Sequence, residues 1–218
     1  MKTKLLRRLC LYIGLASSLA ITSLNAQVSL NFVRFQSETI AKTEYDYINI
    51  DALVINTGTG VRVGIFNNTT PTGSASATKP TVASIFFDAS SSYLNTTPTF
   101  NTGMSSSGVE FVFGGSPGDL PGGTQIGFSA DSNFTATPPP PKNGLNPGEF
   151  AYFDFAGSSY DKVVKGLYNG NVRFGVHVLQ VGPKGEDSLS LVTTAIPEPS
   201  SALLGLLGAA LFMTRRKR

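Results

Sequence analysis

The sequence predicts an all-β fold, a single jelly-roll-like β-sandwich, with a short apolar segment at each end of the chain. Runs of residues that alternate between apolar and polar side chains recur along residues 27–194, with the period of two that half-buried strands require. Stretches rich in Gly, Pro, Ser, Thr and Asn separate these runs, and long helical patterns are lacking. About 168 residues are enough for one domain with a substantial core.

The first half of the body contains the clearest strand signals. Residues 27–35 alternate between apolar and polar side chains, and so do residues 45–56. The turn signal Thr57-Gly58-Thr59-Gly60 follows, and residues 61–65 alternate again, so residues 45–67 predict a hairpin. Further strands are expected at 81–88 and 109–113, while residues 93–100 predict either one weak strand or an irregular loop.

The second half predicts four more strands, at residues 124–130, 149–156, 172–181 and 188–194. Four consecutive prolines, Pro138 to Pro141, predict a rigid surface segment of polyproline II. Residues 159–167 predict one short helix or turn, and Asn169-Gly170 predicts a hairpin turn before the next strand.

The N-terminus has the order of a secretory signal peptide, with Lys2, Lys4, Arg7 and Arg8 before an uncharged, mostly apolar stretch. We expect residues 1–26 to be removed by cleavage between Ala26 and Gln27. Leu24 is larger than the cleavage pattern prefers, which leaves the bond open by a few residues, and an uncleaved anchor is the alternative. Cys10, the only cysteine, lies in this segment, so the processed chain has no disulfide or thiolate chemistry.

The C-terminal segment, residues 195–218, has three parts in a fixed order. Pro197-Glu198-Pro199 is stiff and extended because proline restricts its own φ and the residue before it. The uncharged residues 200–214 predict a transmembrane helix about 22 Å long, short for a hydrocarbon core of about 30 Å. Four terminal cations should stay on the cytoplasmic side, which puts the body across the membrane. They are Arg215, Arg216, Lys217 and Arg218.

This order resembles the PEP-CTERM sorting signal of bacterial envelope proteins. The resemblance implies that an exosortase, a membrane-embedded cysteine transpeptidase-like enzyme, recognises Pro197, Glu198 and Pro199 and cuts near them. These residues would be a substrate motif without a catalytic role. A plain tail anchor is the alternative interpretation of the same segment.

A weaker resemblance to proteins of this kind covers about residues 145–194. It consists of Gly144-Leu145-Asn146-Pro147-Gly148-Glu149, then His177-Val178-Leu179-Gln180, then Gly185-Glu186-Asp187-Ser188. The second element contains an extra leucine, and Glu-Asp precedes the serine of the third. The resemblance supports membership of the family and implies no chemistry.

Eight of the 17 cations lie in the two terminal segments, so the charge of the whole chain misrepresents the body. The remaining nine cations face 13 carboxylates, which gives the body a net charge of −4. No basic stripe is present, and nucleic acid is therefore not an expected partner.

Catalytic motifs are not evident in the body. His177 is the only histidine, lies in the middle of an expected strand and has no nucleophile-elbow motif to serve, so a structural role is favoured. Zinc is improbable with one histidine and no mature cysteine. No cofactor is expected, although structural calcium remains an open alternative to simple solvated carboxylates. The candidate ligands are Glu44, Asp46, Asp51, Glu186 and Asp187.

These observations predict an exported, non-enzymatic protein of the cell envelope or extracellular matrix. It would be anchored transiently in the inner membrane and processed by signal peptidase and an exosortase. The family resemblance implies an association with exopolysaccharide or biofilm. One alternative is a carbohydrate-binding module that presents a row of tyrosines, and a less favoured one is a glycoside or polysaccharide hydrolase with two carboxylates. The candidate tyrosines are Tyr45, Tyr47, Tyr93, Tyr152, Tyr160 and Tyr168.

Overall fold

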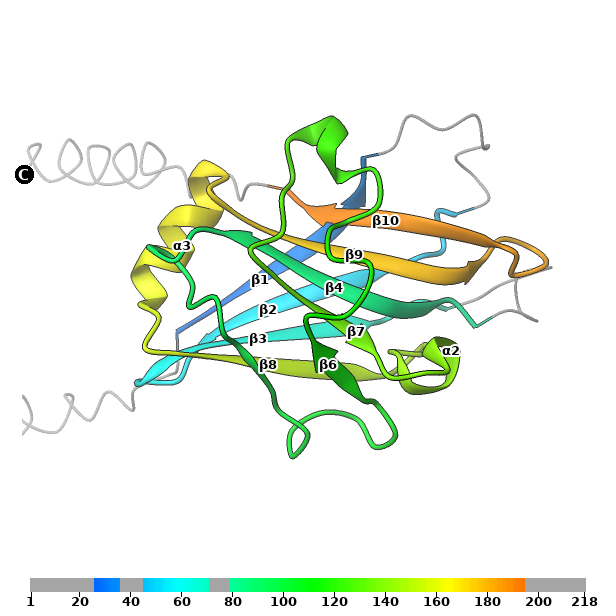
Figure 1. Cartoon of the computed structure of the whole chain (residues 1–218), viewed down its shortest axis with the longest axis horizontal. Helices are drawn as coiled ribbons and strands as arrows, with labels where there is room; N and C mark the ends of the chain where they lie inside the picture. The colour runs from blue at the N-terminus through cyan, green and yellow to red at the C-terminus, as the bar shows by residue number, and fades with distance from the viewer. Residues whose placement is uncertain (1–25, 36–44, 71–78, 195–218) are drawn as a thin grey trace, which may run out of the picture.

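The computed structural model describes residues 26–35, 45–70 and 79–194, and the rest of the chain lies outside the described part (Figure 1). The described residues form a predominantly β fold, as the sequence predicts. The helical segments are η3 (Gly123–Ile126), α2 (Pro140–Asn143) and α3 (Tyr160–Asn169). The strands are β1 (Gln27–Arg34), β2 (Ile50–Asn56), β3 (Gly60–Asn67), β4 (Thr81–Ala89), β5 (Thr99–Phe100), β6 (Phe111–Phe113), β7 (Ser132–Ala136), β8 (Phe150–Ala156), β9 (Val172–Val181) and β10 (Asp187–Thr193).

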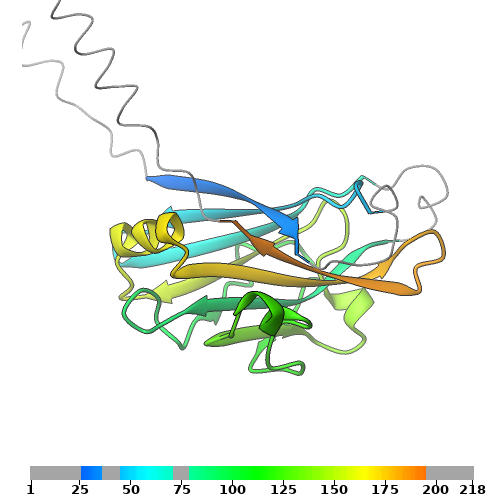
Figure 2. The same cartoon turned by 90° about the horizontal axis from the view of Figure 1, so that it is seen from above.

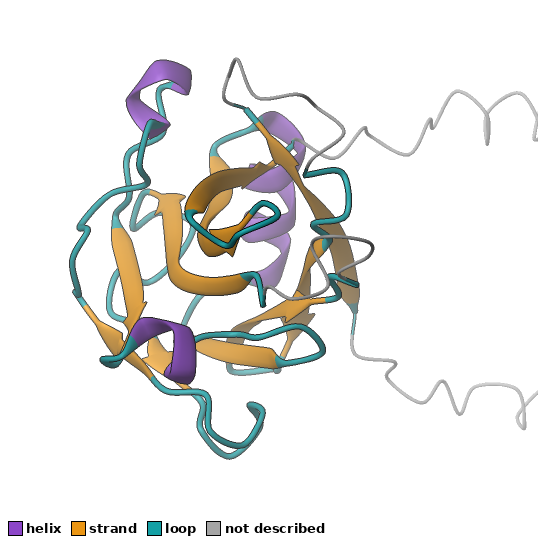
Figure 3. Cartoon of the chain, turned by 90° about the vertical axis from the view of Figure 1, so that its right-hand side faces the viewer, coloured by secondary structure: helices purple, strands orange, loops and turns teal. Residues whose placement is uncertain are grey.

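The strands form one antiparallel sheet that folds over until it is nearly closed around the interior (Figure 3). Their order is β5-β8-β3-β2-β1-β10-β9-β4-β7-β6. β1 joins the two layers, because residues 27–31 pair with β2 while residues 32–34 pair with β10. The first layer therefore contains β5, β8, β3 and β2, and the second contains β10, β9, β4, β7 and β6.

The strand pairing is nested. β4 pairs with β7, β3 pairs with β8, and β1 pairs with β10, so the chain folds back on itself around the segment between β5 and β6. The hairpin predicted at residues 45–67 is confirmed in β2 and β3, although the first strand begins only at Ile50, because residues 45–47 form a turn.

Every second side chain of a strand points into the space between the layers, and most of these inward side chains are apolar. Ala151, Phe153 and Phe155 of β8 point inward and are fully buried, as their spacing predicts. At the centre, the ring of Phe87 lies 4.9 Å from that of Phe155 and 5.5 Å from that of Phe174, centroid to centroid. Phe87 and Phe174 come from one layer and Phe155 from the other, so these edge-on contacts hold the layers together.

The helix α3 confirms the short helix expected near residues 159–167, and it closes one end of the interior. Val163 and Leu167 are buried in the main core, and Gly166 allows the helix to approach Val172 and Tyr93 closely. Gly170 ends the helix with φ 75°, a left-handed conformation that glycine adopts readily. The Asn169-Gly170 pair is therefore a helix end, and the prediction of a hairpin turn there is wrong.

The prediction of a strand at residues 124–130 is also wrong. These residues belong to a longer excursion, residues 114–131, that includes η3 and that we call the strap. Phe128 and Leu120 are buried in a second, smaller core with Phe86 and Val192, on the outer face of the second layer. Alternating apolar residues thus face a sheet without joining it, and the strand in this region, β7, begins only at Ser132.

Arg173 anchors the strap to β9 and β4. Its guanidinium donates to Asp88 and to the carbonyl oxygens of Ile126 and Gly127, and it lies 5.3 Å from the ring centroid of Phe128. A basic side chain on a strand therefore holds both the backbone and an aromatic ring of the strap.

The polyproline II prediction for residues 138–141 is wrong, because Pro138 and Pro139 form a bend and the two prolines that follow are helical. Pro140 begins the helical turn α2, and Pro138 and Pro139 are exposed on the surface as expected. The weak strand near residues 93–100 is reduced to β5, which covers only Thr99 and Phe100.

Of the predicted signal peptide, residues 1–26, only Ala26 is described, and the predicted sorting segment, residues 195–218 with Pro197, Glu198 and Pro199, lies outside the described residues. Among the residues that are described, no helix has the length and apolar character needed to span a membrane.

Candidate functional site

Shallow polar hollows surround the first turns of α3, at one end of the body. One of about 450 Å³ lies between the β4–β5 connection and the start of α3, lined by Ser92, Tyr93, Asn95, Ser158 and Lys162 among others. A second, of about 340 Å³, shares Gly157, Ser158 and Ser159 with it and extends to the β2–β3 turn. Their hydroxyl and amide groups are partly used within the fold, since the Ser158 hydroxyl accepts a hydrogen bond from the backbone N–H of Asn95.

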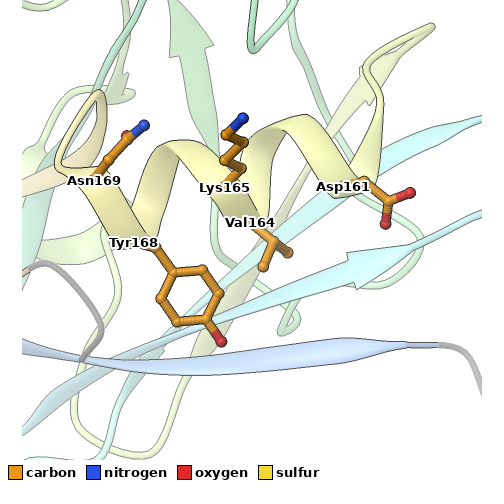
Figure 4. Close-up of a pocket in the computed structure, with 5 residues that line it drawn as sticks. All are labelled: Asp161, Val164, Lys165, Tyr168 and Asn169. Carbon is orange, nitrogen blue, oxygen red and sulfur yellow. The ribbon is translucent and has the colours of Figure 1, made fainter. Parts of the chain in front are cut away.

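A third hollow, of about 270 Å³, follows the exposed side of α3 (Figure 4). Asp161, Val164, Lys165, Tyr168 and Asn169 line it, and Figure 4 shows the Tyr168 ring extending from the helix toward the neighbouring strands. Burial raises the pKa of nearby Tyr160, with smaller contributions from Tyr168 and Asp161. These groups offer polar contacts and no arrangement of nucleophile and base.

The outer surface of the first layer carries a different set of side chains, which we call the open face. It consists of the outward-pointing residues of β1, β2, β3 and β8. Strand register arranges them in three rows that cross the sheet. The rows are Asn31-Asp51-Phe66-Phe150, Ser29-Leu53-Gly64-Tyr152 and Gln27-Ile55-Arg62-Asp154.

Three aromatic rings occupy one part of the open face. The ring centroid of Phe66 lies 5.8 Å from those of Phe150 and Tyr152, and the Phe66 and Tyr152 planes are nearly perpendicular. A Cβ added to Gly64 would lie 2.6 Å from the ring of Tyr152, so the ring lies directly over this glycine. All three rings are half-buried, whereas Phe86 on the outer side of the second layer is buried beneath Phe128 and Leu120 of the strap.

Beside the rings, Arg62 and Asp154 form an ion pair in which Nε of Arg62 lies 2.6 Å from an Asp154 carboxylate oxygen. Arg62 donates two hydrogen bonds to this carboxylate and Asn101 donates a third, 2.7 Å long, while Met104 contacts the guanidinium from the adjacent loop. Burial by itself would raise the pKa of Asp154. The hydrogen bonds from Arg62 and Asn101 and the charge of Arg62 outweigh burial, so the pKa is lowered and the group stays ionised.

The six candidate tyrosines do not form the row that a tyrosine-based carbohydrate site would need. Tyr152 lies on the open face, while Tyr93, Tyr160 and Tyr168 lie near α3. Tyr45 is buried at the opposite end, where its hydroxyl donates to Asp187, and the hydroxyl of Tyr47 accepts from the backbone N–H of Gly182. Sequence reasoning identified Tyr152 but missed Phe66 and Phe150, whose grouping becomes visible only when the register of β3 and β8 is known.

His177 lies on β9, between Ser84 of β4 and Ser190 of β10, and its side chain is half-buried. Burial lowers its pKa, so the imidazole is predominantly neutral at pH 7. The register places a serine on each side of it, but the third member of a triad, an adjacent carboxylate, does not pair with it in either ladder.

Of the carboxylates proposed for calcium, those that the structure describes do not form a group of three. Glu44 lies outside the described residues, Asp51 accepts a hydrogen bond from Asn68, and Asp187 accepts one from Tyr45. Among described residues, no three side chains of His, Cys, Asp or Glu group closely enough to hold a metal ion.

Other carboxylates serve the fold. Asp88 pairs with Arg173, Asp119 accepts from the backbone N–H groups of Leu120 and Ala130, and Glu149 accepts from Asn146. Their hydrogen bonds fix loops and ladders of the body.

Comparison with known proteins gives no relative: no family model, curated protein or solved structure matches this chain.

Proposed function

We propose that the chain is an exported, non-enzymatic protein of the cell envelope or extracellular matrix, associated with exopolysaccharide. Signal peptidase would remove residues 1–26, and an exosortase would act at Pro197, Glu198 and Pro199 after transient anchoring in the inner membrane. The body left behind would be a jelly-roll-like sandwich, which the nested pairing of β4 with β7, β3 with β8 and β1 with β10 supports.

One observation carries this proposal: the boundaries of the folded body agree with the two expected cleavage sites. β1 begins at Gln27, the first residue after the expected signal-peptide bond. β10 ends at Thr193, four residues before Pro197. Both cuts therefore leave every strand intact, and the first removes only one described backbone hydrogen bond, from Asn56 N–H to the carbonyl of Ala26.

The direction of the terminal strands supports the same proposal. β1 starts at the end of the body where α3 lies, and β10 runs antiparallel to β1 toward that end (Figure 2). Thr193 pairs with Phe32, so β10 ends partway along β1, and both terminal strands meet their flanking segments away from the β9–β10 turn.

The chemistry of the body supports a non-enzymatic role. Its ion pairs and carboxylate hydrogen bonds stabilise loops and strand ladders, and the pKa of Asp154 is lowered, the opposite of what a catalytic acid at neutral pH requires. The open face and the α3 hollows are shallow surfaces suited to contact.

The intact mass of the exported protein tests this proposal. Expression of the full chain in a bacterium that has an exosortase should give a product that begins at Gln27 and has lost the apolar segment and the terminal cations. In a strain without the exosortase, the C-terminal segment should remain and the protein should stay with the membrane fraction.

A matched pair of variants isolates the motif. Glu198→Ala should prevent C-terminal processing, whereas Glu186→Ala, in the exposed turn before β10, should leave processing unchanged. A full-length cytoplasmic product, or normal loss of the tail in the strain without exosortase, would contradict the proposal.

A further inference from the structure

The open face has the properties of a carbohydrate-binding platform. The rings of Phe66, Phe150 and Tyr152 are partly exposed on the outer surface of the sheet, next to Leu53 and Gly64. Aromatic rings offer an apolar surface on which the C–H side of a sugar ring can pack, while polar groups nearby bind its hydroxyls. The fold buries a comparable ring on the other layer, where Leu120 and Phe128 of the strap cover Phe86 of β4.

Polar groups lie on both sides of the rings and are already held in place. On one side, Asn68 donates a 2.7 Å hydrogen bond to Asp51, which is the neighbour of Phe66 across the β2–β3 ladder. On the other, Arg62 and Asn101 share the carboxylate of Asp154. Each pair has donor and acceptor capacity left for a ligand, and binding needs little further ordering of these side chains.

The charges on the face select among polysaccharides. Two carboxylates, Asp51 and Asp154, accompany one cation, Arg62, and that cation is already paired. An anionic polymer would meet unpaired negative charge here, whereas a neutral polymer would not. Neighbouring strands are about 4.8 Å apart, so the four strands of the face span about 14 Å between the outermost backbones. This length suits a polymer better than a single sugar.

We infer that the open face binds a neutral polysaccharide, whose sugar rings pack on Tyr152, Phe66 and Phe150 while Asp51, Arg62 and Asn101 bind hydroxyl groups. The inference rests on the proposed function, because it names the surface through which an exported protein would associate with exopolysaccharide. It concerns binding alone and involves no bond cleavage.

Depletion of the protein from solution by insoluble polysaccharide tests the inference. The full chain, purified in mild detergent, is mixed with amorphous cellulose, insoluble xylan, agarose and curdlan as neutral polymers, and with calcium alginate beads as the anionic one. We expect at least one neutral polymer to retain the protein, retention to persist at high salt, and alginate to retain less.

Tyr152→Ala should weaken retention by about tenfold, the effect of losing one stacked ring. Phe113→Ala is the matched control, because Phe113 is 50% exposed on β6, away from the open face. Loss of its ring should leave retention by the polysaccharide unchanged. Leu53→Lys is a second variant that places a cation beside Gly64 while leaving the three rings intact, and it should also weaken retention. Thermal unfolding of each variant establishes that it is folded.

Three results would overturn the inference: no retention by any neutral polymer, unchanged retention in folded Tyr152→Ala and Leu53→Lys, or salt-sensitive binding that prefers alginate. Self-association that Tyr152→Ala abolishes, without polysaccharide retention, would assign the face to a second copy of the chain and would also overturn it. These measurements use unprocessed protein, so they are independent of whether an exosortase acts on the chain.

Discussion

Single residues in this protein act through the environment that the sheet gives them. His177 and Asp154 both lie on outward-pointing strand positions, yet their pKa values are lowered for different reasons. Burial disfavours the protonated imidazole of His177. In Asp154, hydrogen bonds and the charge of Arg62 outweigh burial and favour the ionised carboxylate.

The lowered pKa of His177 predicts a loss of stability in mild acid. Above its ordinary pKa of 6.5, the histidine is neutral in both the folded and the unfolded chain and contributes no pH dependence. Below that value the unfolded chain takes up the proton more readily, so the free energy of unfolding falls until the pH drops below the folded pKa. Denaturant unfolding of the protein at pH 7 and pH 5 should show this fall.

The variant His177→Gln should have a smaller difference in stability between pH 7 and pH 5 than the parent protein. Asp154 does not interfere in this window, because its stabilising effect is lost only as pH falls below its ordinary value of 3.8. Equal pH dependence in parent and variant would show that His177 is not the group responsible.

At the scale of elements, the close approach of α3 to its neighbours decides which residue can stand at a position, even where another residue would have a higher helix propensity. The α3 sequence has a glycine in its interior, where alanine would normally favour the helix by about 1 kcal/mol. A Cβ at Gly166 would, however, lie 2.4 Å from Cγ2 of Val172 and 2.9 Å from the ring of Tyr93. The glycine is therefore required by the docking of the helix on β9 and on the β4–β5 connection.

Gly166→Ala should accordingly destabilise the protein, by about 1–2 kcal/mol net, although it improves the helix propensity of α3. Denaturant unfolding measures the change. Lys165→Ala is the control, because Lys165 is exposed on the same helix and its substitution should change stability by less than about 0.5 kcal/mol. A Gly166→Ala protein more stable than the parent would mean that the helix and β9 are not in close contact.

On the scale of the whole molecule, the described residues form two cores of unequal importance. The main core lies between the layers around Phe87 and includes residues from β1 to β10. The second lies between the strap and the outer face of the second layer and contains only Phe86, Leu120, Phe128 and Val192 among its buried members. Loss of packing in the main core should therefore affect every described strand. Loss of packing in the second core should affect mainly the strap.

The two cores predict different responses to the same kind of substitution. Phe87→Ala should lower the free energy of unfolding by about 3–5 kcal/mol, and amide exchange should increase in both layers. Phe128→Ala should also be destabilising, but the increase in amide exchange should be concentrated in residues 114–131. Uniform acceleration over the body in Phe128→Ala would contradict the division into two cores.

Period-two alternation was enough to locate most strands, because a residue between two layers must be apolar and its neighbour need not be. The inward set of Ala151, Phe153 and Phe155 was predictable for the same reason. The strap was not: Ile126 and Phe128 alternate as a strand would, but they pack on the outside of a sheet. Alternation in the sequence indicates which side chains are buried, but it does not indicate which part of the protein buries them.

The sequence by itself determined the β character of the body, the absence of cysteine from residues 27–194 and the arrangement of the two terminal segments, since composition, period and the order of charges are local properties of the chain. Only the tertiary structure decided that Phe66, Phe150 and Tyr152 form one surface and that Arg62, Asn101 and Asp154 lie beside it. These residues are up to 92 positions apart, and strand register, set by the packing of the interior, brings them together.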